Sequence, residues 1–205
     1  MELESRLCQT GGMSDVIHLK ITLVDAEPAI WRRVEVLSAI TLKDLHSIIQ
    51  AAMGWQNYHL YQFHVGRETI NGPGFVDVGF SGQSNVTAGR IGLDELVESK
   101  VKRFVYLYDM GDGWEHELRV EKVLPADPDV RYPHFIDGAG ACPPEDVGGL
   151  PGFFNFLEAM QDPKHPDRKD LLDWYGGSFD ADYLDEAAIK KRLARLGPRK
   201  KRKAA

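Results

Sequence analysis

Residues 103–123, RFVYLYDMGDGWEHELRVEKV, carry the strongest fold signal in the chain, because they predict two β-strands joined by a tight reversal. In the second arm, apolar or aromatic residues alternate with charged ones, so Trp114 and His116 would share one face. In the reversal, Gly111 and Gly113 permit the positive φ angles that a tight turn needs. The stretch therefore predicts a β-hairpin and, with it, an antiparallel sheet.

The residues upstream of this hairpin predict a second hairpin and a helix. Residues 16–24 and 30–37 alternate like half-buried strands, although Arg32 interrupts the apolar face of the second one. Residues 42–53 carry an apolar stripe at helical spacing, and residues 60–65 form a further strand pattern. This order of strand, strand, helix and strand resembles the opening of a β-grasp domain.

The rest of the chain predicts loops and helices. Residues 66–85 are rich in Gly, Ser and Asn and predict a surface loop that holds a short strand near Phe75–Val78. Further helices are predicted at about residues 91–98, 153–160, 167–174 and 181–196. We therefore expect an α+β fold, with a mainly antiparallel sheet built from hairpins and covered by the N-terminal helix and a C-terminal group of helices.

Length and composition predict one domain in the cytoplasm. The 205 residues are 43% hydrophobic, enough for one sizeable core, which we place at residues 15–196. Residues 1–14 are predicted to be a disordered leader, with Met13 as a candidate start, and residues 197–205 a disordered basic tail. Because no stretch of 18 apolar residues and no secretory signal occurs, we expect a cytoplasmic protein that makes no membrane contact.

Charge is divided unevenly along the chain. Residues 188–205 contain nine Lys or Arg and no acid, so the rest carries 16 basic and 31 acidic side chains, a net charge of −15. Such a body would repel nucleic acid, whereas the tail could attract phosphates without sequence preference. The predicted nucleic-acid contacts are Arg199, Lys200, Lys201, Arg202 and Lys203. The alternative is a solubilising tail, free or docked on its own acidic body.

The strongest candidate for chemistry is the hairpin tip, where Asp109, Asp112 and His116 gather two carboxylates and an imidazole around one reversal. A divalent cation could bind there if another segment completes its coordination shell. The predicted metal ligands are His59, Asp109, Asp112, His116 and Glu145. Alternatively, the aspartates bond turn amides and His116 bonds a buried carbonyl or carboxylate, as such residues commonly do.

Cysteine usage and missing motifs exclude several classes of protein. Two cysteines, Cys8 and Cys142, are too few for a disulfide framework and lack the spacing of a zinc site. Cys142 could act as a nucleophile if His116 or His134 came within hydrogen-bond reach; otherwise it is an inert thiol that pins its loop. The motifs of P-loop nucleotidases, Rossmann enzymes, zincins and α/β-hydrolases do not occur in the sequence.

Four motifs in order resemble one known family. They are Pro28–Val34 (PAIWRRV), Leu45–Trp55 (LHSIIQAAMGW), Tyr106–His116 (YLYDMGDGWEH) and Cys142–Gly149 (CPPEDVGG). Together they are similar to the Ri-plasmid "open reading frame three"-like family, over about residues 16–193. Some members carry the label of an insertion-element passenger protein of the TnpR type. The resemblance implies an α+β fold and a link to mobile genetic elements in a functionally uncharacterised family.

The residues do not support the recombination chemistry that the TnpR label borrows from resolvases. No nucleophilic serine accompanies an arginine cluster and a helix-turn-helix arm. The segment His165–Arg168 matches the H-x-x-R of tyrosine recombinases, but Tyr175 follows within the same short helical segment, so the match is one of chance. Members of the family tend to have an acid at position 113 and a histidine at position 61. This chain has Gly113 and Tyr61 instead, which removes two possible metal ligands.

The sequence as a whole favours a binding protein. We expect a non-enzymatic accessory or interaction protein that binds an unknown protein or small ligand through residues 109–116 and 142–149. The predicted contact residues are His59, Asp109, Asp112, Trp114, His116, Cys142, Glu145 and Asp146. The alternatives are a divalent-metal-dependent hydrolase, with phosphodiesters as a candidate substrate, and a weak nucleic-acid binder that uses the tail.

Overall fold

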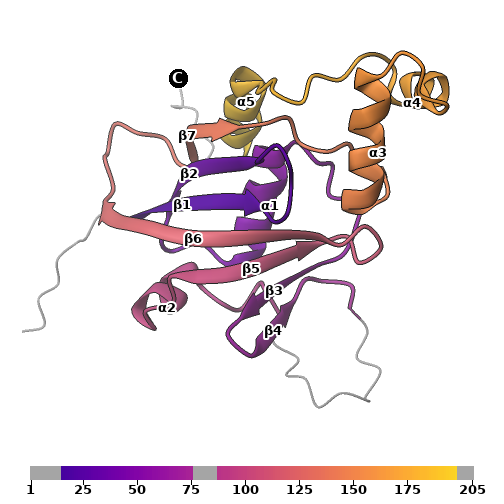
Figure 1. Ribbon diagram of the computed structural model, residues 1–205. Coiled ribbons are helices and arrows are strands. Elements are labelled where there is room, and N and C mark those ends of the chain that lie inside the picture. The colour runs from indigo at the N-terminus through magenta and orange to yellow at the C-terminus, as the bar shows by residue number, and fades with distance from the viewer. Residues whose placement is uncertain (1–14, 76–86, 198–205) are drawn as a thin grey trace, which may run out of the picture.

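The computed structural model describes residues 15–75 and 87–197. In these ranges the chain forms a seven-stranded antiparallel sheet and five helices, which confirms the α+β class (Figure 1). The predicted leader, the five basic tail residues 199–203 and most of the strand predicted near Phe75–Val78 lie outside the described residues. No helix in the described ranges combines the length and the apolar character that crossing a membrane requires.

The sheet contains two edge strands that the sequence patterns do not predict, β4 and β7. The strands are β1 (Asp15–Leu23), β2 (Trp31–Leu37), β3 (Tyr61–Val65), β4 (Glu68–Asn71), β5 (Arg103–Tyr108), β6 (Trp114–Pro125) and β7 (His134–Ala139). The helices are α1 (Leu42–Met53), α2 (Leu93–Glu98), α3 (Gly149–Gln161), α4 (Arg168–Tyr175) and α5 (Glu186–Leu196). The order across the sheet is β4-β3-β5-β6-β1-β2-β7.

Both predicted hairpins are confirmed. β5 and β6 pair with Tyr106 opposite His116 and Tyr108 opposite Trp114, and β1 and β2 form the other hairpin. The long strand β6 also pairs with β1, so the two hairpins belong to one sheet. β3 pairs with β4 and β5 rather than with the first hairpin. The likeness to a β-grasp opening is therefore limited to the order of the elements along the chain.

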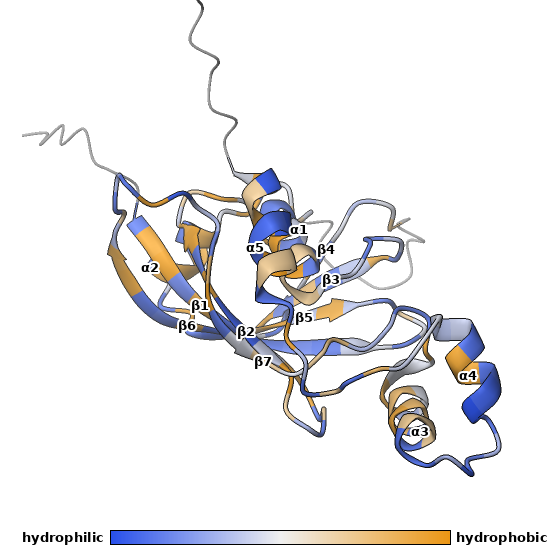
Figure 2. Cartoon of the chain, turned by 90° about the horizontal axis from the view of Figure 1, so that it is seen from above, coloured by the Kyte–Doolittle hydropathy of each residue, from blue (hydrophilic) through white to orange (hydrophobic). Residues whose placement is uncertain are grey.

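Helix α1 covers one face of the sheet together with α5. It begins with a capping box, in which Thr41 Oγ1 accepts from Asp44 N at 3.2 Å and Asp44 Oδ2 accepts from Thr41 N at 3.0 Å. It ends at Gly54, whose φ of 106° is left-handed. α5 lies beside α1 in Figure 2 and buries Ile189 and Leu193. The C-terminal end of α1 and one side of α5 therefore lie next to each other.

Helices α3 and α4 stand at the end of the sheet where the β5–β6 hairpin reverses (Figure 1). Phe156 of α3 packs edge-on against Trp174 and Tyr175 of α4, with ring centroids 6.1 and 5.4 Å apart. The ring of Phe179, which follows α4, lies 5.2 Å from Phe156. These aromatic contacts hold α4 and the segment that follows it against α3.

Candidate functional site: the hairpin tip and an aromatic cleft

The hairpin tip is held by its own backbone and by the side chain of Asp109. Gly113 N donates to Asp109 O at 2.7 Å, and Gly111 N donates to Asp109 Oδ1 at 2.8 Å. Asp109 and Gly113 both adopt left-handed conformations, with φ of 58° and 70°. An aspartate tolerates this conformation better than most residues because its side chain can bond the nearby backbone. Its second oxygen, Oδ2, lies 3.5 Å from His59 Nε2.

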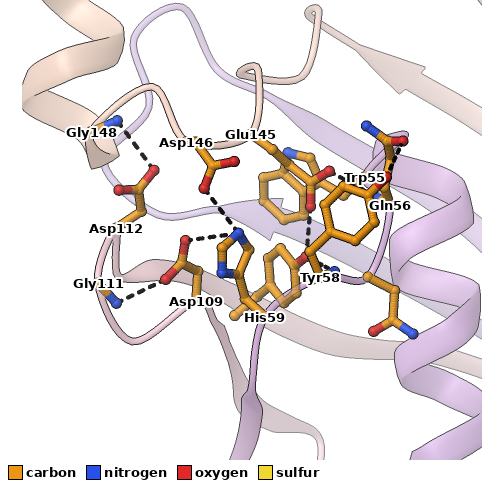
Figure 3. Close-up of polar contacts among 12 residues, drawn as sticks. Trp55, Gln56, Tyr58, His59, Asp109, Gly111, Asp112, Glu145, Asp146 and Gly148 are labelled. Carbon is orange, nitrogen blue, oxygen red and sulfur yellow. Dashed lines mark hydrogen bonds and ion pairs between the residues drawn. The ribbon is translucent and has the colours of Figure 1, made fainter.

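A second loop, residues 140–148, packs against the tip (Figure 3). Gly148 N donates to Asp112 Oδ2 at 3.2 Å. The approach is so close at Gly149 that a Cβ there would lie 2.5 Å from Asp112 O, and its φ of +66° also favours glycine. The tip and the loop therefore form one continuous polar surface.

Three side chains, His59, Asp109 and Asp146, converge between the tip and the loop (Figure 3). His59 Nε2 lies 3.0 Å from Asp146 Oδ1 and 3.5 Å from Asp109 Oδ2, and the three potential ligand atoms lie within 4.8 Å of one another. Neighbouring ligands that share one cation at about 2.0–2.2 Å lie about 3.0–3.5 Å apart. The distance from the imidazole to each carboxylate is therefore suited to a shared cation.

Two of the predicted metal ligands are occupied in holding the loop. Glu145 accepts hydrogen bonds from Tyr108 Oη at 2.6 Å and from Gln56 N at 2.8 Å. Asp112 accepts the loop amide described above. Neither carboxylate belongs to the converging set, in which Asp146 joins two of the predicted ligands.

Trp114 and His116 face the core, which corrects their predicted place in the contact surface. They are 1% and 0% exposed, because alternation along β6 turns both inward and the ring of Trp55 lies 5.8 and 5.2 Å from theirs. Burial lowers the pKa of His116 to about 4, so its ring is neutral at pH 7. Its Nδ1–H donates to Trp114 O at 3.2 Å, and its Nε2 has no hydrogen-bond partner among the described residues.

Trp55 fastens the loop to the end of α1. Its Nε1–H donates to Pro143 O at 2.9 Å, and its ring stacks on Tyr108 with centroids 5.0 Å apart. Because Trp55 directly follows the Gly54 cap, the helix end, the loop and strand β5 are held together by one side chain.

The loop also borders an open cleft of about 570 Å³. One wall consists of residues 141–146 and the end of α1, and the other of α4, the segment after it and α5. Four solvent-exposed aromatic side chains line the cleft: Tyr58, Trp174, Tyr175 and Tyr183. Every Trp, Tyr or Phe that is exposed in the described part of the chain belongs to this group.

Two arginines contribute to the floor of the cleft. Arg32 is 2% exposed, and it donates through Nε to Ala52 O at 3.1 Å and through Nη1 to two further carbonyls at 2.8 Å. Arg192 donates through Nε to Ala51 O at 2.7 Å. Both therefore bind carbonyls at the C-terminal end of α1, where the helix dipole favours positive charge. Burial lowers the pKa of both guanidinium groups, and each is near enough to Cys142 to influence it.

Cys142 lines the cleft but is poorly suited to be a nucleophile. Burial raises the pKa of its thiol to about 12, although the nearby Arg32 acts in the opposite direction. The thiol is therefore neutral at physiological pH. No hydrogen bond joins Cys142 to His116 or His134 among the described residues, so the Cys–His pair considered from the sequence does not form there.

The sequence patterns point to neither the arginine floor nor the aromatic lining. Arg32 gives one signal, because it interrupts the apolar face of β2, where a charge is costly to bury. Arg192, Trp174 and Tyr183 give none, since such residues are ordinary on short amphipathic helices and loops. They line the same cleft as Arg32 only because α5 packs beside α1 and α4 packs on α3.

Comparison with known proteins finds relatives that span nearly the whole chain. The family described as plasmid pRiA4b ORF-3-like protein matches residues 15–188. The uncharacterized protein y4hQ of Sinorhizobium fredii is 38% identical over 200 residues, which cover 94% of this chain and 97% of that protein. The crystal structure of MM3350, a protein of unknown function from Methanosarcina mazei Go1, matches with a TM-score of 0.74 and 33% identity, over 88% of this chain and 98% of that one. Neither relative's name assigns an activity.

Proposed function

The chain belongs to the plasmid pRiA4b ORF-3-like family, as its four motifs predict, and from its cleft we propose that it is a non-enzymatic binding module for a small ligand. The uncharacterised relatives supply no activity, so the proposal rests on the geometry of this chain. An accessory role on plasmids or other mobile elements, which the family description suggests, is part of the same proposal.

One observation carries the proposal: the exposed aromatic rings of the described residues all line a single cleft. Apolar surface left in water costs free energy, so its concentration in one concave place indicates a binding site. Small-molecule sites typically have volumes of about 300–1,000 Å³, aromatic walls and a few polar groups. The cleft, at about 570 Å³, has each of these properties.

The groups in and near the cleft favour binding over catalysis. The Cys142 thiol is held neutral by a pKa of about 12, so little thiolate exists to attack a substrate. His116 could serve as a base only if it reached the ligand, and it is fully buried. The carboxylate of Glu145 is bonded to Tyr108 Oη and Gln56 N, which positions the loop instead of leaving it free for proton transfer.

The proposal can be tested by a fragment screen read by ¹H–¹⁵N NMR. Neutral, anionic and cationic aromatic fragments should perturb the amides of residues 141–146 and the Trp174 indole. The double variant Trp174→Ala/Tyr183→Ala should weaken the best fragment at least about tenfold, because it removes most of one aromatic wall. The control Ile136→Ala removes exposed apolar surface on β7, outside the cleft, and should bind as the wild type does. Equal binding by the double variant would sink the proposal.

A divalent-metal-dependent hydrolase, with phosphodiesters as candidate substrates, is the second candidate. It is favoured by the convergence of His59, Asp109 and Asp146. His59 Nε2 is shielded from solvent, yet it makes no hydrogen bond of good geometry to either carboxylate. Three protein ligands of this kind leave coordination positions for water, which a bound metal activates.

Metal binding separates this candidate from the first. Untagged protein dialysed against Zn²⁺ or Mn²⁺ should retain about one ion per chain by elemental analysis, and His59→Ala or Asp146→Asn should abolish retention, because each removes one of three ligands. Asp112→Asn is the matched control, since Asp112 lies at the same tip but bonds Gly148 N. If neither the wild type nor Asp112→Asn retained metal, the metal-dependent hydrolase would be ruled out.

A further inference from the structure

The floor of the cleft carries two positive charges that no carboxylate pairs with in residues 15–75 and 87–197. In the described residues, no carboxylate oxygen lies within 4.0 Å of a nitrogen of Arg32 or Arg192. A buried charge without a counter-charge is costly, and proteins generally pair such groups or bind an ion with them. Arg32 is 98% buried, so the missing partner is a property of the site rather than of the solvent-exposed surface.

The three acids that line the cleft do not supply this partner. Glu145 accepts hydrogen bonds from Tyr108 Oη and Gln56 N, and Asp146 Oδ1 lies 3.0 Å from His59 Nε2. Asp185 caps α5, where its Oδ1 accepts from Ala188 N at 2.8 Å. Asp185 is near enough to raise the pKa of Arg192, but it forms no ion pair with it. Glu145 and Asp185 therefore hold structural elements, Asp146 lies against His59, and none of the three forms an ion pair with Arg32 or Arg192.

The two arginines, in contrast, have guanidinium N–H groups that make no hydrogen bond in the described residues. Nη2 of Arg32 and both Nη1 and Nη2 of Arg192 make no hydrogen bond in the part of the chain that the structure describes. Capping the carbonyls at the end of α1 explains why each Nε is placed where it is. It leaves the remaining N–H groups unexplained, and both arginines line a cleft that is open to solvent.

These observations point to the chemical class of the ligand. We infer that the guanidinium groups of Arg32 and Arg192 bind the carboxylate or phosphate of a small ligand whose flat ring lies against Trp174 and Tyr183, an inference that rests on the proposed binding function. Guanidinium groups present N–H pairs that match the oxygens of such anions, and desolvation strengthens these charged hydrogen bonds. Exposed Trp and Tyr rings are suited to stack on a planar ligand.

Four probes separate charge recognition from ring recognition. They are inorganic phosphate, phenyl phosphate, benzoate and benzylamine. Each is titrated into ¹⁵N-labelled full-length protein, and the backbone amides and arginine Nε–Hε signals are followed. We expect phenyl phosphate or benzoate to bind at least about tenfold more tightly than benzylamine, because a charged hydrogen bond contributes a factor of this size. The Nε–Hε signals of Arg32 and Arg192 should shift together, which reports on Arg32 without mutating it.

Arg192→Gln is the test variant, and Arg195→Gln is its matched control. Arg195 lies one turn further along α5, is exposed and does not line the cleft, so its replacement removes the same charge elsewhere. Arg192→Gln should weaken the best anion at least about tenfold, and Arg195→Gln by less than about twofold. If Arg192→Gln proves unstable, Arg192→Lys keeps the charge but loses the paired donors and should still weaken binding measurably.

The possible outcomes are distinct. Benzylamine binding as tightly as phenyl phosphate, or equal affinities in the two glutamine variants, would overturn the inference and leave the binding function standing. Binding of no aromatic probe would contradict both. Preferred binding of phenyl phosphate over benzoate would assign a phosphate ligand, and the reverse a carboxylate.

Discussion

The hairpin tip and the floor of the cleft both adjoin loop 140–148, but they differ in how their charges are satisfied. At the tip, Asp109 and Asp112 accept backbone amides, and His59 lies against two carboxylates. At the floor, two arginines keep unused donors although one of them is almost fully buried. The acids of the tip are bonded to the fold around them, whereas the arginines of the floor retain N–H donors that make no hydrogen bond in the described residues.

The largest expected effect concerns Trp55, the side chain that holds loop 140–148 to the end of α1 and to β5. Trp55→Ala should lower the free energy of unfolding by about 3–5 kcal/mol, the usual cost of deleting a large buried aromatic ring. It also removes the hydrogen bond to Pro143 O, so loop 140–148 should lose its fixed position. Urea unfolding measures the first effect, and the amide signals of the loop the second.

Trp174→Ala serves as the control for this prediction. Trp174 is 49% exposed, so its loss should cost less than about 1 kcal/mol. If the two variants were equally stable, Trp55 would not be the side chain that holds loop 140–148 in place.

A smaller effect should appear on acidification, and it arises from buried histidines rather than from the tip carboxylates. Burial lowers the pKa of His46 and of His116 to about 4, against about 6.5 in an unfolded chain. Between these values the unfolded state binds protons that the native state excludes, so stability falls as the pH drops from about 6.5 to about 4. Each histidine should contribute a loss of about 2 kcal/mol between pH 7 and pH 5.

The variant His46→Gln isolates one of these two contributions. His46 hydrogen-bonds Tyr106 Oη at 2.7 Å and Asn57 Oδ1 at 2.5 Å, and a glutamine amide offers both an acceptor and a donor. Urea unfolding at pH 7 and pH 5 should give about half the wild-type loss in this variant. An unchanged loss would mean that His46 does not titrate on unfolding.

The parts of the fold that could be predicted from the sequence are those that depend on local patterns. The hairpins and α1 depend on local patterns, such as alternation in β6 and the capping box at Thr41. The edge strands β4 and β7 escape prediction because the first is only four residues long and the second contains Asp137 and Gly138, which are rare in strands. The sequences of these two segments have little preference for a strand. Their contacts with the neighbouring strand therefore decide their conformation.

The candidate site also has one part that the sequence predicts and one part that it does not. The sequence predicts that residues 109–116 and 142–149 serve one surface, and the structure places Asp112 of the tip against Gly148 of loop 140–148. The proximity of Arg32 and Arg192 depends on how β2 and α5 pack around the end of α1, and no short-range pattern encodes it. The polar residues around the reversal favour a contact surface that includes Trp114 and His116, but alternation along β6 turns both side chains into the core.

A third prediction concerns the hydrogen bonds that hold Glu145 and its loop. Tyr108→Phe removes the hydroxyl that donates to Glu145 Oε1 and accepts from Tyr58 N at 3.1 Å. The free energy of unfolding should fall by about 1–2 kcal/mol, because a part-buried carboxylate loses a charged hydrogen bond. Tyr175→Phe is the control, since the Tyr175 hydroxyl makes no hydrogen bond in the described residues. Equal stabilities for the two variants, measured in urea, would show that Glu145 does not anchor the loop.

The smallest expected effect tests whether the floor of the cleft is unpaired in the free protein. Arg192→Gln loses the hydrogen bond to Ala51 O, worth about 1 kcal/mol, but it also removes a positive charge near Arg32. The two effects oppose each other, so the net change in unfolding free energy should stay within about 1 kcal/mol. Raising the salt concentration to about 0.5 M should stabilise the wild type more than the variant, because salt weakens repulsion that only the wild type retains. Equal salt responses in urea unfolding would mean that Arg32 and Arg192 do not repel each other, and the contrast between the floor and the tip would then lose its electrostatic basis.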